Sequence, residues 1–145
     1  MMRKKSGTVI FISSLLGRVT SPFFGPYSMS KFALSSGAEM LHKELKKVTD
    51  TVHVAIIEPG AFHTGFNQAM IEKKFQWMDK KSYFAGIKSQ IRKDELRQFA
   101  LVEQKNLDSI VHKIVAAAEA DKPRLQASAP WWQGFGAYLL RVLGK

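Results

Sequence analysis

Tyr27-Ser28-Met29-Ser30-Lys31 is the stretch on which the interpretation of this chain rests. A tyrosine and a lysine four residues apart occupy one face of a helix, so the ammonium group can lie close to the phenol. A positive charge at that distance favours the ionised phenol, which makes the tyrosine a better proton donor and acceptor near neutral pH. The stretch therefore predicts a helix that carries an acid-base pair. In isolation, such a pair is often only a half-buried ring beside a solvated charge.

The tyrosine and lysine are the third part of an ordered series. A strand-like apolar run at residues 8–13 is followed by Ser14, and a loop rich in glycine and proline then leads to Tyr27. Ser13 is the alternative serine, and its side chain would point away from that of Ser14 because side chains alternate along a strand. The order and spacing of these parts are more specific than any one of them.

A second block of sequence supports the first. Residues 52–57 form a β-branched apolar run of strand length, typical of a strand buried on both faces of a parallel sheet. Glu58-Pro59-Gly60 is expected to end that strand. Ligands bind at the carboxyl ends of strands in open α/β sheets. The plainer alternative is a strand-ending turn with Phe62 in the core.

Together these blocks resemble the catalytic half of the short-chain dehydrogenase/reductase family. The resemblance implies an α/β fold, namely the C-terminal part of a Rossmann-type doubly wound parallel sheet. It implies that Ser14 orients the substrate carbonyl and that Tyr27 moves the proton. Lys31 then holds the nicotinamide ribose and assists Tyr27. The thirteen-residue spacing before Tyr27 favours Ser14 over Ser13.

The resemblance also assigns a cofactor-binding segment, in which Pro59, Gly60, Phe62 and Thr64 match the family pattern. These residues, with Tyr27 and Lys31, are expected to contact NAD or NADP. The implied reaction is hydride transfer between a nicotinamide and a small-molecule alcohol or ketone. The choice between NAD and NADP and the identity of the substrate stay open.

Other parts of the family pattern are not found in the sequence. Gly134-Phe135-Gly136 has no strand-to-helix context, so it does not match the glycine-rich turn of a dinucleotide fold. Residues 1–5 are expected to end a preceding helix. We therefore interpret residues 1–145 as the C-terminal catalytic half of a short-chain dehydrogenase domain, without its N-terminal cofactor-binding half. The alternative is a catalytically silent fragment that acts as a binding or assembly module.

The rest of the chain is expected to add helices and one short strand. The predicted elements are a long helix, a mixed segment at the family's variable substrate-binding region, two further helices and a strand, at residues 27–48, 65–78, 81–104, 107–120 and 124–128 respectively. No internal repeat or low-complexity linker interrupts them, which indicates one domain fragment.

Composition narrows the function classes. The chain has 145 residues and no cysteine, which excludes disulfides and thiolate metal sites and is compatible with the cytoplasm. The four histidines lack ligand spacing, so we expect no metal site. The net charge of +10 comes from basic residues interleaved with acidic ones, which argues against a nucleic-acid surface.

The C-terminal stretch, residues 131–143, is aromatic, apolar and weakly basic. One interpretation is contact with a membrane surface, and the plainer alternative, which is favoured, is a terminal helix that packs near the substrate pocket or at a subunit contact. The helix that starts near Tyr27 is a common dimer surface in the family, so a homo-oligomer is a further expectation. No apolar run reaches the roughly 18 residues of a membrane span.

Overall fold

The computed structural model describes residues 1, 6–78 and 80–144 of the chain. The helix end predicted at residues 2–5 lies outside these residues. The chain forms two compact units, the first made of residues 1–60 and 108–145 and the second of residues 61–107. The assignment of all 145 residues to one catalytic half-domain stays a prediction.

The first unit is built on a three-stranded parallel sheet. Its strands are β1 (Gly7–Ile12), β2 (Val52–Pro59) and β3 (Gln126–Ala129), in the order β1-β2-β3. β2 continues to Pro59, beyond its predicted end, because Pro59 pairs with Ala129 and the Gly60 amide donates to the Ala129 carbonyl at 2.8 Å. The amide of Gly60 thus continues the pairing after a proline that has no donor of its own.

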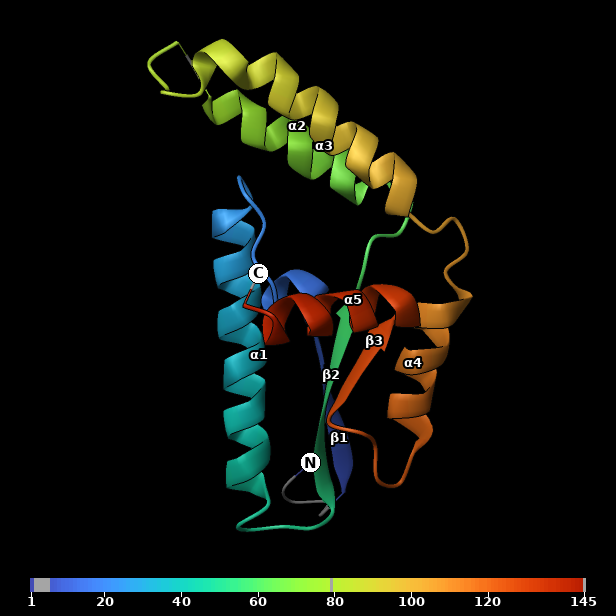
Figure 1. The fold of residues 1–145 in the computed structure, drawn as a ribbon. Coiled ribbons are helices and arrows are strands. Elements are labelled where there is room, and N and C mark those ends of the chain that lie inside the picture. The colour runs from blue at the N-terminus through green and yellow to red at the C-terminus, as the bar shows by residue number, and fades with distance from the viewer. Residues whose placement is uncertain (2–5, 79, 145) are drawn as a thin grey trace. The chain divides into compact units, whose positions relative to one another are not determined.

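Two long helices enclose this sheet. α1 (Gly25–Leu45) and α4 (Asp108–Glu119) lie on opposite sides of it (Figure 1). Val54 and Ile56 of β2 pack with Ala38 of α1 in a cluster whose members are at most 1% exposed. Alternate residues of a strand point to opposite faces of the sheet. Ala55 and Ile57, which alternate with Val54 and Ile56, are also at most 1% exposed. The continuous apolar pattern of β2 is thus explained by burial on both sides.

α1 confirms the predicted long helix with shifted ends. It begins at Gly25, followed by Pro26, whose fixed φ and missing amide hydrogen suit the first turn of a helix. It ends at Leu45, three residues before the predicted Val48, because the amides of Val48 and Thr49 both bond to the Leu45 carbonyl in a tight turn. The first turns of α1 carry the predicted tyrosine and lysine.

Two shorter helices complete the first unit. η2 (Leu15–Gly17) follows β1, and α5 (Trp131–Val142) follows β3. α5 packs against β3 through small residues, and a Cβ added at Gly134 would lie only 2.2 Å from Ser128 Oγ. Among the described residues, no helix is both long and apolar enough to cross a membrane.

The second unit is a pair of helices that lie side by side (Figure 1). Its elements are α2 (Phe66–Trp77), the short η3 (Ala85–Ile87) and α3 (Lys88–Val102). Ile71 and Phe75, four residues apart on one face, are buried, so the predicted mixed segment is a helix instead. The helix predicted from Lys81 begins only at Lys88. The Ser82 hydroxyl accepts a bond from the Phe84 amide and favours a turn before it.

Two glycines should respond oppositely to alanine substitution. A Cβ at Gly17 would lie 2.9 Å from the Lys31 carbonyl oxygen, so Gly17→Ala should lower the free energy of unfolding by about 1–3 kcal/mol. Gly37, inside α1, has no neighbour within 4 Å of an added Cβ, so Gly37→Ala should raise it by about 0.5–1 kcal/mol. Urea denaturation measures both. Equal effects would contradict the close approach of η2 to α1.

Candidate active site

Ser14 lies in the turn that follows β1. It is the N-cap of η2, where its Oγ accepts a hydrogen bond from the Leu16 amide at 3.2 Å. The same hydroxyl donates to the Pro59 carbonyl at a long 3.4 Å. Ser14 is 8% exposed. The weak bond to Pro59 leaves this hydroxyl able to turn to another acceptor.

Ser13, the alternative serine, has structural partners instead. Its amide donates to the Ile57 carbonyl at 2.8 Å, which continues the pairing of β1 with β2. Its Oγ lies 2.7 Å from Ser35 Oγ and donates to the Lys31 carbonyl at 3.2 Å, so it is bonded to α1. The two adjacent serines point to different partners, as strand alternation predicts.

Tyr27 and Lys31 share one face of α1, as their spacing predicts. The Lys31 ammonium lies 5.7 Å from the centre of the Tyr27 ring, and both side chains are half-buried. Lys31 Nζ also donates to the carbonyl of Ile12, the last residue of β1, at 3.1 Å. This hydrogen bond places the lysine at the carboxyl end of the sheet, near the strand that leads to Ser14.

Pro59 and Gly60 lie at the end of β2 in the same unit. The Pro59 carbonyl accepts from Ser14, and Gly60 is close to the side chain of Gln133 in α5. A Cβ at Gly60 would lie 2.1 Å from Gln133 Oε1. A larger residue here would displace the Gln133 side chain of α5, which is a reason for glycine separate from the predicted contact with a nicotinamide.

Phe62 and Thr64 belong to the second unit. Phe62 is 7% exposed, and its carbonyl accepts from the Thr64 amide and from Asn67 Nδ2. Thr64 is exposed, and its Oγ1 accepts from the Phe66 amide at the start of α2. These contacts give both residues local roles, and their predicted cofactor roles remain predictions.

Glu103 is a polar centre of the second unit that sequence reasoning missed. Its carboxylate accepts from Asn67 Nδ2 and Gln68 Nε2 and lies 2.8 Å from His63 Nδ1. Burial alone would raise the pKa of Glu103. The hydrogen bonds from Asn67, His63 and Gln68 outweigh burial and lower the pKa below its ordinary value. The clue in the sequence is an acid directly after an amphipathic helix.

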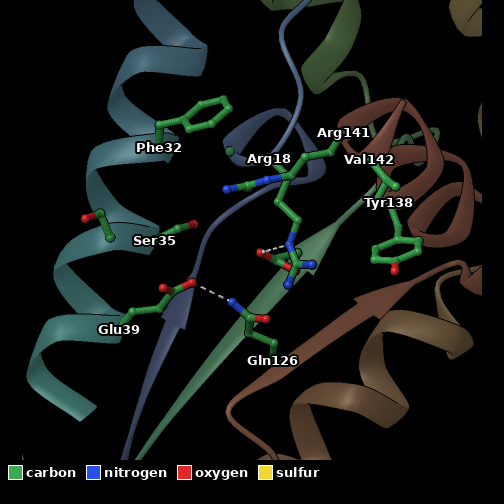
Figure 2. Close-up of a pocket in the computed structure, with 11 residues that line it drawn as sticks. Arg18, Phe32, Ser35, Glu39, Gln126, Tyr138, Arg141 and Val142 are labelled. Atoms are coloured by element: carbon green, nitrogen blue, oxygen red, sulfur yellow. Dashed lines mark hydrogen bonds and ion pairs between the residues drawn. The ribbon is translucent and has the colours of Figure 1, made fainter. Parts of the chain in front are cut away.

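A buried ion pair in the first unit was also missed. Arg18 Nε donates to Glu58 Oε1 at 2.7 Å, and the Glu58 side chain is only 1% exposed. The pair lines a pocket of about 500 Å³ between α1 and α5. Figure 2 shows side chains that enter this pocket from both helices, among them Phe32, Glu39, Tyr138 and Arg141. A glutamate at the end of a buried strand was the available sequence signal, because a buried carboxylate needs a partner.

The pKa of Glu58 reflects opposing influences. Burial raises it above the ordinary carboxyl value, and the hydrogen bond and charge of Arg18 partly offset that rise. Glu39 raises the Glu58 pKa further, and Arg141 lowers it. Arg18 therefore favours the charged form of a carboxyl group whose burial disfavours the charge.

Comparison with known proteins identifies the family. The family model described as short chain dehydrogenase matches residues 1–74, which hold β1, α1 and β2. The chain belongs to the short-chain dehydrogenase family. This membership and the predicted α/β fold class are confirmed.

The relatives of this short-chain dehydrogenase chain are longer than the chain itself. Human 17-beta-hydroxysteroid dehydrogenase type 6 is 28% identical over 138 residues, which are 90% of this chain and 43% of that protein. Mouse retinol dehydrogenase 16 is 45% identical over 65 residues, 45% of this chain and 20% of that protein. The chain spans less than half the length of these curated relatives.

Solved structures of the family share the fold. A short chain dehydrogenase/reductase from Burkholderia phymatum in complex with NAD superposes with a TM-score of 0.66 at 15% identity, over 95% of this chain and 48% of that one. A short-chain dehydrogenase from Streptomyces avermitilis gives a TM-score of 0.62 at 24% identity, over 98% and 47%. At these identities the likeness concerns the fold.

The raised pKa of Glu58 predicts a specific pH dependence of stability. A carboxyl group whose pKa is higher in the folded state stabilises the fold below its unfolded pKa, and this contribution is lost as pH rises through the folded pKa. The unfolding free energy of the wild type, minus that of Glu58→Gln, should therefore fall as pH rises above the ordinary carboxyl range. The slope should reach at most about 1.4 kcal/mol per pH unit. Urea melts between pH 4 and 8 measure it, and a rising difference would contradict the assignment.

Proposed function

We propose that the chain is the catalytic half of an NAD(P)-dependent oxidoreductase acting on a small alcohol or ketone. The observation that carries this proposal is that Lys31 and Ser14 lie at the carboxyl ends of β1 and β2, with the Tyr27 ring beside Lys31 on α1. Lys31 bonds to the last carbonyl of β1, and Ser14 bonds to the last carbonyl of β2. Ligands of parallel α/β sheets bind at this edge.

The residues fit a nicotinamide cofactor. An ammonium group has three donor hydrogens, and the bond from Lys31 to the Ile12 carbonyl uses one, so Lys31 can also bind ribose hydroxyls. The relative from Burkholderia phymatum was solved with NAD, and several relatives are named for the dehydrogenation of alcohols. These likenesses support NAD or NADP for the whole enzyme, of which this chain spans less than half the length.

The roles of the chain's own residues follow from their chemistry. A nicotinamide, when bound, would supply the hydride chemistry at the carbonyl or alcohol carbon, and Lys31 would hold its ribose. Tyr27 Oη gives its proton to the carbonyl oxygen, and the Ser14 hydroxyl donates a hydrogen bond to the negative charge that develops there. The Lys31 charge stabilises the tyrosinate that remains. In oxidation of the alcohol, each transfer is reversed.

Cofactor titration tests this function. NADH and NADPH are titrated against the purified chain by fluorescence, with Tyr27→Phe and Lys31→Ala beside the wild type. Saturable binding that weakens at least about tenfold in Lys31→Ala is expected, because charge-assisted hydrogen bonds contribute about 1.5–3 kcal/mol. Tyr27→Phe should bind nearly as well but abolish turnover.

A folded wild-type chain that binds neither nucleotide would contradict cofactor binding by this chain. The silent binding module would then be the better description. Gly37→Ala, six residues beyond Lys31 in α1 and open around its Cβ, serves as the control for handling and folding.

A second candidate function, contact with a membrane surface, is favoured by α5. The helix turns small residues such as Gly134 and Ala137 toward the protein. Its large apolar side chains are instead 40–77% exposed; they are Trp131, Trp132, Phe135, Tyr138, Leu139, Leu140 and Val142, followed by Leu143. An exposed apolar surface on a chain with a net charge of +10 suits binding to a membrane that contains anionic lipids. We also propose that the chain self-associates through α1 and that it is located in the cytoplasm.

Vesicle binding tests the role of α5 with a matched pair of variants. Leu140→Ser removes an exposed leucine from α5, and Leu101→Ser removes one from α3. If α5 enters the lipid interface, Leu140→Ser should weaken binding to phosphatidylserine-containing vesicles about tenfold, since burying a leucine contributes roughly 1.5–3 kcal/mol. Leu101→Ser should leave binding unchanged. Equal losses, or no binding by the wild type, would contradict the interfacial role.

A further inference from the structure

The ion pair between Arg18 and Glu58 connects the two segments that hold Ser14. Arg18 directly follows η2, which Ser14 caps, and Glu58 directly precedes Pro59, whose carbonyl accepts from Ser14. The ion pair at 2.7 Å and the hydrogen bond at 3.4 Å thus join the same turn to the same strand end. Of these two contacts, the ion pair is the shorter and the one between full charges.

The turn is short enough to transmit this restraint. The Arg18 amide donates to the Leu15 carbonyl at 2.9 Å, and the Gly17 amide donates to the Ser14 carbonyl at 2.9 Å. Arg18 is therefore fixed to η2 through its backbone and to β2 through its side chain. The Ser14 hydroxyl accepts from the Leu16 amide within the turn and donates only a long bond to Pro59, so its position relative to β2 depends on how the turn is held.

Burial makes this pair a durable restraint. The Glu58 side chain is 1% exposed and that of Arg18 is 25% exposed, so solvent screens the pair weakly. Glu58 Oε2 makes no hydrogen bond to another described residue. Removing Arg18 would leave a buried carboxyl group without its partner, so Glu58 would take up a proton or draw in water, and in either case the charged contact from the turn to β2 would be lost. The pair lines the pocket of Figure 2.

We propose that Arg18 and Glu58 are positioning residues that hold the Ser14 hydroxyl at the carboxyl end of β2 for contact with the substrate. The inference rests on the proposed function, because the ion pair affects catalysis only if Ser14 contacts the substrate. Arg18 contacts Glu58 through Nε alone, so the contact needs a positive charge with one donor and not the planar fork of a guanidinium. The Arg18→Lys variant should therefore keep part of the ion pair with Glu58 and part of the positioning of Ser14.

Amide hydrogen exchange by NMR tests the positioning without any need for turnover. In Arg18→Ala, the Leu16 and Gly17 amides, which bond to Ser14, should exchange at least about tenfold faster. Amides of α4 should change much less. Arg92→Ala is the matched control, because it removes an arginine from the exposed ion pair with Glu72 in the second unit. Arg18→Lys should restore slow exchange at Leu16.

Activity supplies a second readout. Where the wild type reduces a carbonyl compound, Arg18→Ala should lower kcat about tenfold and leave KM for the nucleotide within about twofold, because Ser14 acts on substrate and not on cofactor. Arg18→Lys should recover most of kcat. A general loss of stability would raise the exchange rate at all amides. It would not lower kcat while leaving KM for the nucleotide unchanged.

The outcomes separate the two proposals. Unchanged exchange at Leu16 in Arg18→Ala, or a uniform increase across both units, would overturn the positioning role. A wild type that binds no nucleotide and turns over no substrate would instead overturn the proposed function, while the exchange data would still decide whether the pair holds Ser14. If Arg18→Ala does not fold, Glu58→Gln, which keeps an acceptor for Arg18 but removes the buried charge, takes its place.

Discussion

Parallel pairing of β1 with β2 is the constraint on which the rest of the first unit depends. The register runs from Gly7 opposite Val52 to Ile12 opposite Ile57, so both strands end at one edge of the sheet. Residues that follow the two strands then meet although some 45 positions separate them in the chain, as Ser14 and Pro59 do. The same edge receives the ammonium of Lys31 from α1. The register thus determines which polar groups can act together.

Close backbone approach fixes the elements around that edge. Gly17 lets η2 touch the backbone of α1 near Lys31, and Gly60 leaves room for Gln133 of α5. At both positions, the space beside the glycine is occupied by an element that comes later in the sequence. The site is therefore assembled by packing as much as by hydrogen bonds, and a single methyl group at either position would disturb it.

Family membership and the geometry of the site are independent observations that support the same proposed function. The family match covers the serine in the turn after β1 and the tyrosine and lysine of α1. The ion pair of Arg18 with Glu58 adds a feature that connects this catalytic edge to the pocket between α1 and α5. A buried charge at the end of a central strand is costly unless it is paired, and its pairing here falls beside the proposed catalytic serine.

Local sequence determined the strands predicted at residues 8–13 and 52–57, the long helix predicted from Tyr27, and the shared face of Tyr27 and Lys31, because these features depend on spacing and on apolar runs. The structure shifts the ends of these elements. The helix at residues 66–77 was not predicted, because its few buried positions gain their meaning only by packing on α3. Only tertiary structure decided that Ser13 bonds to α1 while Ser14 bonds to Pro59, and that Glu58 pairs with Arg18. Each of these contacts joins residues at least 18 positions apart, and no local pattern specifies such partners.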